Sequence, residues 1–185
     1  MAAALPMVSG CLSSSVQPVS RWTIDYRAGG KYAAAVRYGV ARVSQVSVRA
    51  PYDGDGMSVL RADGSVAADA YNLFAASPSQ LLRGVVFDAL SASGLFAFVV
   101  NGSSAVASDV SVELLVTRLA LDCRGDGDAG RAARAEIVLR LVEPRGKLMK
   151  ALVAAGTADA ADGNYGRAFS AAVSRALEKA LANAR

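Results

Sequence analysis

The stretch SPSQLLRGVVFDALSASGLFAFVV, from Ser77 to Val100, contains the two kinds of element that define the fold. Pro78 suits the first position of a helix, and Ser77 with Gln80 has the spacing of a capping box. Gly94 is a typical helix end. Between these signals, apolar side chains recur on one face: Leu81, Leu82, Val85, Val86 and Ala89. The stretch therefore predicts an amphipathic helix followed by a buried strand over residues 96–100.

Alternating apolar and polar residues on both sides of this helix predict further strands. The segments with this pattern are 21–27, 36–48, 57–60, 66–71, 110–123, 134–143 and 148–157. A second amphipathic helix is expected over 164–184, with Phe169, Val173 and Leu177 on one face. Trp22 and Tyr26 are expected in the core. Two such helices against a mostly antiparallel sheet predict a single-domain α+β sandwich.

The composition favours a globular domain without catalytic machinery. Of the 185 residues, 53% are apolar and 19% are charged, which is enough apolar sequence to build a core. Histidine is absent, and this excludes Ser-His-Asp and Cys-His arrangements. The net charge of +4 is concentrated in the first 50 residues, but its basic residues are spread singly. We therefore expect a solvated basic face and no nucleic-acid partner.

Several short motifs suggest a functional site but lack residues that the site would need. A calcium loop beginning at Asp53 would need a glutamate where Gly64 stands, and one beginning at Asp126 would need Asp or Asn where Gly130 stands. Aspartate and glycine are common in tight turns, so turns are expected at both places. Cys123 follows an apolar run and is expected to be a small core residue. We predict no enzymatic activity, no metal and no cofactor.

The start of the chain carries a candidate lipidation signal. Val8-Ser9-Gly10-Cys11 has an aliphatic residue and two small residues before a cysteine, the pattern cut by the lipoprotein signal peptidase. Cys11 would then carry the lipid, and the serine-rich residues 12–18 would form a tether. No basic residue precedes Arg21, although secretory signals usually contain one. Either the natural start lies upstream or the match is fortuitous, in which case Cys11 belongs to an apolar N-terminal strand.

A longer pattern follows from Ala41 onward. A strand over 43–48 leads into Ala50-Pro51-Tyr52-Asp53, and a second strand follows over 57–61. Tyr71, Phe74 and Pro78 then precede the first helix. Further matching stretches are Ser93-Gly94-Leu95-Phe96, Ser108-Asp109-Val110 and Arg145-Gly146-Lys147-Leu148. This order resembles the ABC-type transport auxiliary lipoproteins, the PqiC-like family associated with MCE-domain lipid transporters.

The resemblance implies a lipoprotein remnant and tether over residues 1–20 and an auxiliary lipoprotein domain over 21–185. Such a protein would be periplasmic, anchored to the outer membrane, and would dock to an MCE-domain subunit of a phospholipid transport system. Contact with phospholipid and a homo-oligomeric state are compatible with it. The alternatives are a structural or assembly lipoprotein of the lipopolysaccharide-assembly or secretion type, or a small periplasmic hydrolase. Tyr71, Phe74 and Pro78 would form a partner-binding edge or, alternatively, pack the helix N-terminus.

Overall fold

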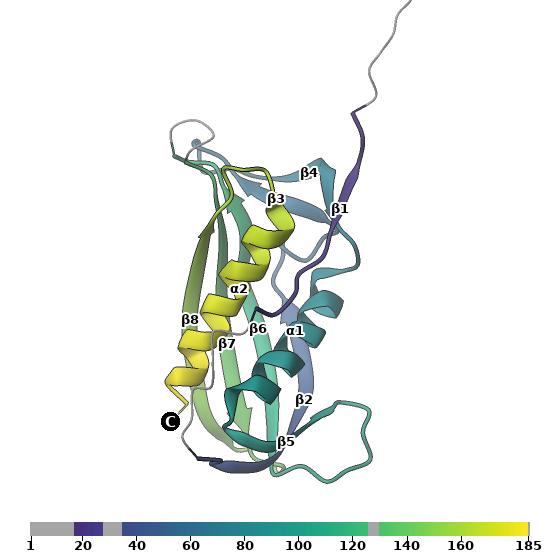
Figure 1. Ribbon diagram of the computed structural model, residues 1–185, viewed down its shortest axis with the longest axis vertical. Helices are drawn as coiled ribbons and strands as arrows, with labels where there is room; N and C mark the ends of the chain where they lie inside the picture. Colours follow the sequence, from purple (N-terminus) through teal and green to yellow (C-terminus); the bar gives the residue numbers. More distant parts are fainter. Residues whose placement is uncertain (1–16, 28–34, 126–129, 185) are drawn as a thin grey trace, which may run out of the picture.

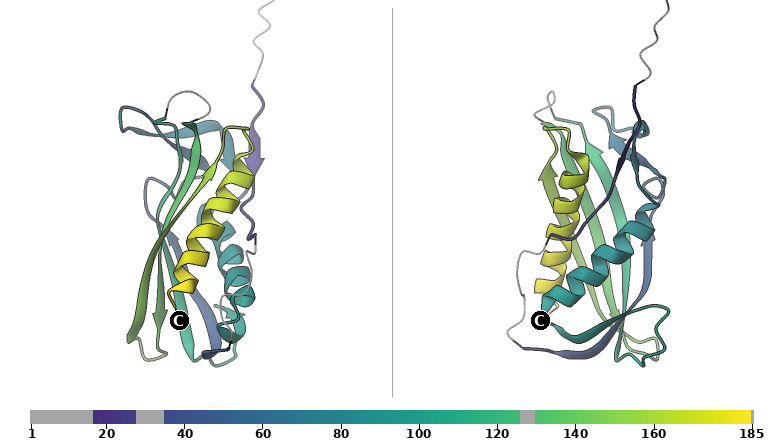
Figure 2. Two further views of the ribbon diagram at one scale, coloured as in Figure 1. Left: turned by 60° about the vertical axis from the view of Figure 1, so that its left-hand side comes forward. Right: turned by 45° about the vertical axis from the view of Figure 1, so that its right-hand side comes forward.

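A twisted sheet with two helices on one face forms the body of the protein (Figures 1 and 2). The computed structural model describes residues 17–27, 35–125 and 130–184. Within these ranges the strands are β1 (Ser20–Trp22), β2 (Tyr38–Val48), β3 (Gly56–Leu60), β4 (Val66–Phe74), β5 (Phe96–Asn101), β6 (Val110–Asp122), β7 (Ala132–Val142) and β8 (Leu148–Asp159). The helices are α1 (Pro78–Ser93) and α2 (Tyr165–Ala182). The predicted single-domain α+β fold is confirmed.

Strand β6 is the axis of the sheet. One of its edges pairs with β7 along its whole length, and β7 pairs with β8; both pairings are antiparallel. The other edge pairs in parallel first with β2 and then, near its end, with β3. Strand β5 extends the sheet beyond β2, and β4 and β1 extend it beyond β3.

The sheet is mixed in direction. In the described ranges, four strand pairs are parallel and three are antiparallel, although the two longest pairings are antiparallel. The expectation of a mostly antiparallel sheet holds for most of the paired residues, in β6–β7–β8 and in β3–β4, whereas the pairings of β2 with β5 and β6, of β3 with β6 and of β1 with β4 are parallel. Alternation of apolar residues reports which face of a strand is buried, but it carries no information on strand direction.

The C-terminal helix lies directly on β8. Gly156 of β8 is buried, and a Cβ atom at this position would lie only 1.9 Å from the carbonyl oxygen of Ala172 in α2. The side chains on the α2 face that packs here are small. The buried alanines of the helix are Ala168, Ala172, Ala176 and Ala180. The absence of bulky side chains on both elements allows this close approach of helix and strand backbones.

Helix α1 has the expected limits but not the expected cap. It begins at Pro78 and ends at Gly94, whose φ of 71° is the left-handed conformation that glycine adopts readily. The side chain of Ser77 makes no capping hydrogen bond. Its hydroxyl lies 3.4 Å from that of Ser79, while its backbone carbonyl accepts the Gln80 amide at 2.9 Å. The predicted capping box is therefore wrong.

The strand expected over 21–27 is confined to Ser20–Trp22. The following residues run across α2 instead of along the sheet: the Asp25 amide donates to Ser170 Oγ and the Arg27 amide to Ser174 Oγ, each at 3.0 Å. Ile24 between them is 3% exposed. A buried side chain with polar neighbours on both sides gives the alternation expected of a strand. Here the alternation arises because α2, and not a neighbouring strand, covers Ile24.

The strand expected to be buried over 96–100 lies at an edge of the sheet. Strand β5 pairs with β2 alone among the described strands. Phe96 is buried and stacks on Tyr38 with ring centroids 5.4 Å apart, but Phe98 is 71% exposed. An apolar run predicts burial on both faces of a strand, and for β5 this prediction is wrong.

We predict that Gly156→Ala lowers the free energy of unfolding by about 1–3 kcal/mol, because the added methyl group overpacks the α2–β8 contact. Urea denaturation measures the effect. Gly54→Ala is the matched control, since no heavy atom lies within 4 Å of a Cβ atom at that position. Equal stabilities of the two variants would contradict the proposed contact.

Candidate functional site

The described residues hold no cluster of three or more His, Cys, Asp or Glu side chains suited to a metal ion. In the same ranges, no helix has the length and apolar character needed to cross a bilayer.

Residues 53–55 lie in a turn, as expected, whereas the predicted turn beginning at Asp126 lies outside the described residues. Cys123 is half-buried against the core.

Asp122 is a buried carboxylate at the end of β6, and its partners indicate a structural role. It accepts two hydrogen bonds from the Arg124 side chain, each at 2.9 Å, and its Oδ2 lies 2.6 Å from Arg134 Nε. The Arg124 bonds, with further help from Arg134, lower the pKa of Asp122 to about 2 against the cost of burial. A carboxylate with so low a pKa has little affinity for a proton and is therefore a weak general base. Its role is structural: it holds Arg124, just after the end of β6, beside Arg134 of β7.

The predicted site residues separate in the structure. Cys11 lies outside the described residues. Phe74 is 1% exposed and packs edge-on against Phe169, with ring centroids 5.5 Å apart. Pro78 is buried, whereas Tyr71 is 44% exposed. Phe74 and Pro78 are therefore core residues, and Tyr71 alone of the three presents its side chain to solvent.

Asp69 fixes the backbone around Tyr71. Its carboxylate accepts the amides of Tyr71 at 2.8 Å and Asn72 at 3.0 Å. Burial opposes ionisation of Asp69, but the bonds from Asn72 and Tyr71 outweigh it and lower the pKa of this carboxyl. Asn72 in turn accepts the indole N–H of Trp22 at 3.0 Å. The position of Tyr71 is thus coupled to the pairing of β1 with β4.

Five exposed apolar side chains lie at one end of the sheet, distributed from β5 at one edge to β8 at the other. Strands β2, β5, β6 and β8 begin at this end, and β7 finishes there (Figure 1). We call it the apolar end; its residues are Val36, Phe98, Val106, Leu148 and Met149, which are 38–71% exposed. The sequence gives no sign of this set, because Phe98 stands in an apolar run that predicts a buried strand and because Leu148 and Met149 open a predicted strand.

The described chain starts at the opposite end of the sheet. Strand β1 pairs with the last residues of β4, and β3 joins this layer to the last residues of β6. The described chain therefore begins at the end of the sheet where β6 finishes, away from the apolar end (Figure 1). Since β6 has thirteen residues, the two ends are separated by roughly 40 Å.

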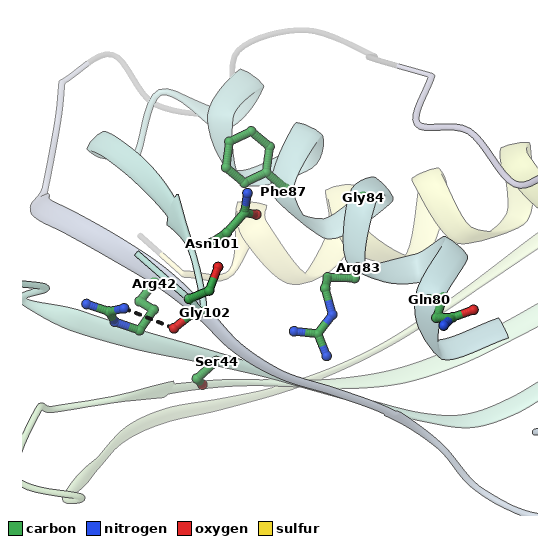
Figure 3. Close-up of a pocket in the computed structure, with 9 residues that line it drawn as sticks. Arg42, Ser44, Gln80, Arg83, Gly84, Phe87, Asn101 and Gly102 are labelled. Atoms are coloured by element: carbon green, nitrogen blue, oxygen red, sulfur yellow. Dashed lines mark hydrogen bonds between the residues drawn. The ribbon is translucent and has the colours of Figure 1, made fainter. Parts of the chain in front are cut away.

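A groove of about 650 Å³ runs between α1 and the edge of β2, close to the point where β5 ends (Figure 3). We call it the α1 groove; it is lined by Arg42, Ser44, Gln80, Arg83, Gly84, Phe87, Asn101, Gly102 and Ser103. Arg42 fixes one wall, because its guanidinium donates to the carbonyls of Gly102, Ser104 and Val106. The sequence offered no signal for this groove, since its residues come from three separate elements.

No family model matches the sequence. No curated protein matches it either. Among solved structures, the fold is similar to protein XCC0632 from Xanthomonas campestris, a DUF330 protein, with a TM-score of 0.58, 18% identity and coverage of 90% of each chain. An uncharacterized protein matches with a TM-score of 0.55 and 18% identity over 88% of this chain and 94% of its own.

The hypothetical protein CT253 from Chlamydia trachomatis matches with a TM-score of 0.50 and 9% identity, over 80% of this chain and 93% of its own. At these identities the three likenesses concern the fold alone. They show that the arrangement of strands and helices described above is shared over nearly the whole length of other proteins.

We predict that Phe74→Ala lowers the free energy of unfolding by about 3–5 kcal/mol, because it removes a buried aromatic ring from the contact with Phe169. Tyr71→Ala should change stability by about 0.5 kcal/mol or less, since this ring is largely exposed. Thermal and urea unfolding of both variants provide the comparison. A mild effect of Phe74→Ala would show that the ring is not a core contact.

We predict that Asp122→Asn lowers the free energy of unfolding at pH 7 by about 1–2 kcal/mol, a figure reduced because both arginine partners are partly exposed. The carboxyl has a pKa of about 2 when folded and about 3.9 when unfolded. Its contribution is therefore complete above pH ~4 and declines as the pH falls toward 2. Urea unfolding between pH 7 and 2.5 tests this, with the exposed Asp53→Asn as control; a pH-independent difference would refute it.

Proposed function

We propose that the protein is a lipid-anchored periplasmic adaptor that docks to an MCE-domain subunit of an ABC-type phospholipid transport system at the outer membrane. The order of motifs from Ala41 onward and the Cys11 signal support this proposal. The observation that carries it is the separation of the two ends of the molecule: the described chain enters at one, and five of the nine large apolar side chains exposed among the described residues lie at the other.

The apolar end has the composition of a protein-binding surface. Phenylalanine and methionine are enriched in the cores of interfaces, and exposed apolar residues along one end of a sheet offer such anchors to a partner. Phe98 and Leu148 are the most suitable anchors, because they are 71% and 53% exposed. A tether at the opposite end directs this surface away from the membrane, toward a partner.

Strand β5 adds a second mode of contact. It is an edge strand in the described sheet, so one row of its backbone amides and carbonyls has no strand partner. A partner segment could pair with that row while its side chains meet Phe98. Backbone pairing and one large anchor together give a contact that needs no catalytic residue.

We predict that the protein co-purifies with an MCE subunit from native membranes, and that Phe98→Asp and Leu148→Asp each abolish the co-purification. The free energy of unfolding of either variant should change by about 0.5 kcal/mol or less, because both side chains are exposed. Val153→Asp is the matched control: Val153 is 75% exposed but lies in the middle of β8, outside the apolar end. Recovery of outer-membrane barrel proteins in place of an MCE subunit would favour the assembly-lipoprotein alternative.

The same membranes test the anchor. The intact mass of the wild-type protein should include a diacylglyceryl group on Cys11 and should lack the residues before it. Cys11→Ser should release the protein from the membrane, whereas Cys123→Ser, at the other cysteine of the chain, should leave it attached. A membrane-associated species without acyl mass would overturn this part of the proposal.

A further inference from the structure

The α1 groove has the size of a site for an organic ligand. Its volume of about 650 Å³ falls within the range of about 300–1,000 Å³ that is usual for small-molecule sites. A lone phosphate or sulfate ion would occupy only a small part of it. Phe87, which is half-buried, adds an apolar wall, and Gln80, Asn101 and Ser103 add neutral polar groups.

Gly84 keeps this groove open. It lies in the interior of α1, where glycine makes a helix less stable than alanine would, because glycine has more conformational freedom in the unfolded chain. No packing contact requires it: no heavy atom lies within 4 Å of a Cβ atom at this position. Since Gly84 lines the groove, a larger side chain would enter the space that a ligand needs. A residue that weakens a helix without improving its packing is typical of a functional site.

The charge of the groove is positive and not neutralised locally. Arg83 forms no hydrogen bond or ion pair with any described residue, and its side chain extends from α1 toward the edge of β2 (Figure 3). Neither aspartate nor glutamate is among the described lining residues. Arg42 adds a second positive charge, but its donors are directed to carbonyl oxygens. Arg83 is thus the group able to bind an anion directly.

We propose that the α1 groove binds an organic phosphate whose phosphate group pairs with Arg83 and whose remaining part lies along Gly84 and Phe87. Arginine binds phosphate oxygens through two parallel N–H donors, which gives this pairing both strength and orientation. A soluble phosphate ester and a phospholipid headgroup share this chemistry. The inference does not depend on the proposed docking function, because the groove residues are distinct from those of the apolar end.

Isothermal titration of the full-length chain tests the proposal. The probes are glycerol 3-phosphate and dihexanoylphosphatidylglycerol, the latter below its micelle-forming concentration. We expect saturable binding that weakens with added salt, since the contact is ionic. Tighter binding of the acylated probe than of glycerol 3-phosphate would favour a phospholipid, because the acyl chains then add contacts, whereas equal or weaker binding would favour a soluble ester.

Two variants connect the binding to the groove. Arg83→Gln should weaken it by about tenfold or more, the usual effect of removing a charged hydrogen-bond partner. Arg145→Gln is the matched control, because Arg145 is exposed in the turn between β7 and β8, outside the groove. Gly84→Leu should abolish binding without lowering the melting temperature, since the position is open.

Three outcomes would overturn the proposal. The first is the absence of saturable binding for both probes. The second is an equal loss for Arg83→Gln and Arg145→Gln, which would indicate attraction to the overall positive charge. The third is unchanged binding by Gly84→Leu, which would place the ligand elsewhere. None of these results affects the membrane co-purification that tests the docking function.

Discussion

The contact between α2 and β8 is the constraint on which the rest of the structure depends. Gly156 allows the carbonyl of Ala172 to approach the strand more closely than any side chain would permit. With α2 fixed there, Phe169 reaches Phe74, and Ser170 and Ser174 receive the amides of residues 25 and 27. The helix thus joins the long antiparallel strands, the β3–β4 layer and the N-terminal segment. Small residues at one crossing place three otherwise separate parts in a common core.

The elements of the fold were largely predictable, and their arrangement was not. Pro78 and Gly94 defined α1 because their backbone constraints are local. The short extent of β1 was not predictable, because Ile24 is buried by α2 and not by a neighbouring strand. The exposure of Phe98 was not predictable, because an apolar run does not reveal that its strand lies at an edge. Parallel pairing of β2 with β6 likewise depends on contacts between distant segments.

The candidate sites also divide into those with a local signal in the sequence and those that distant segments form together. Cys11 carries a local signal, so the sequence alone could suggest it. The α1 groove combines Arg42 of β2, Arg83 of α1 and Asn101 of β5, and no spacing in the chain connects these residues. Tyr71, Phe74 and Pro78 stand close in sequence, yet only Tyr71 is exposed. Proximity along the chain was therefore a poor guide to which side chains share a surface.

The shortness of β1 has a mechanical consequence. Three residue pairs join it to β4, and the Trp22 indole adds one hydrogen bond to Asn72. In a chain tethered upstream of Ser20, any pulling force enters the domain at this point. The bonds of residues 25 and 27 to α2 are next in line, whereas the β6–β7–β8 strands carry little of the load. In such a chain a sustained pull would detach these residues first, and the distance between the tether point and the domain would grow while the long strands stayed paired.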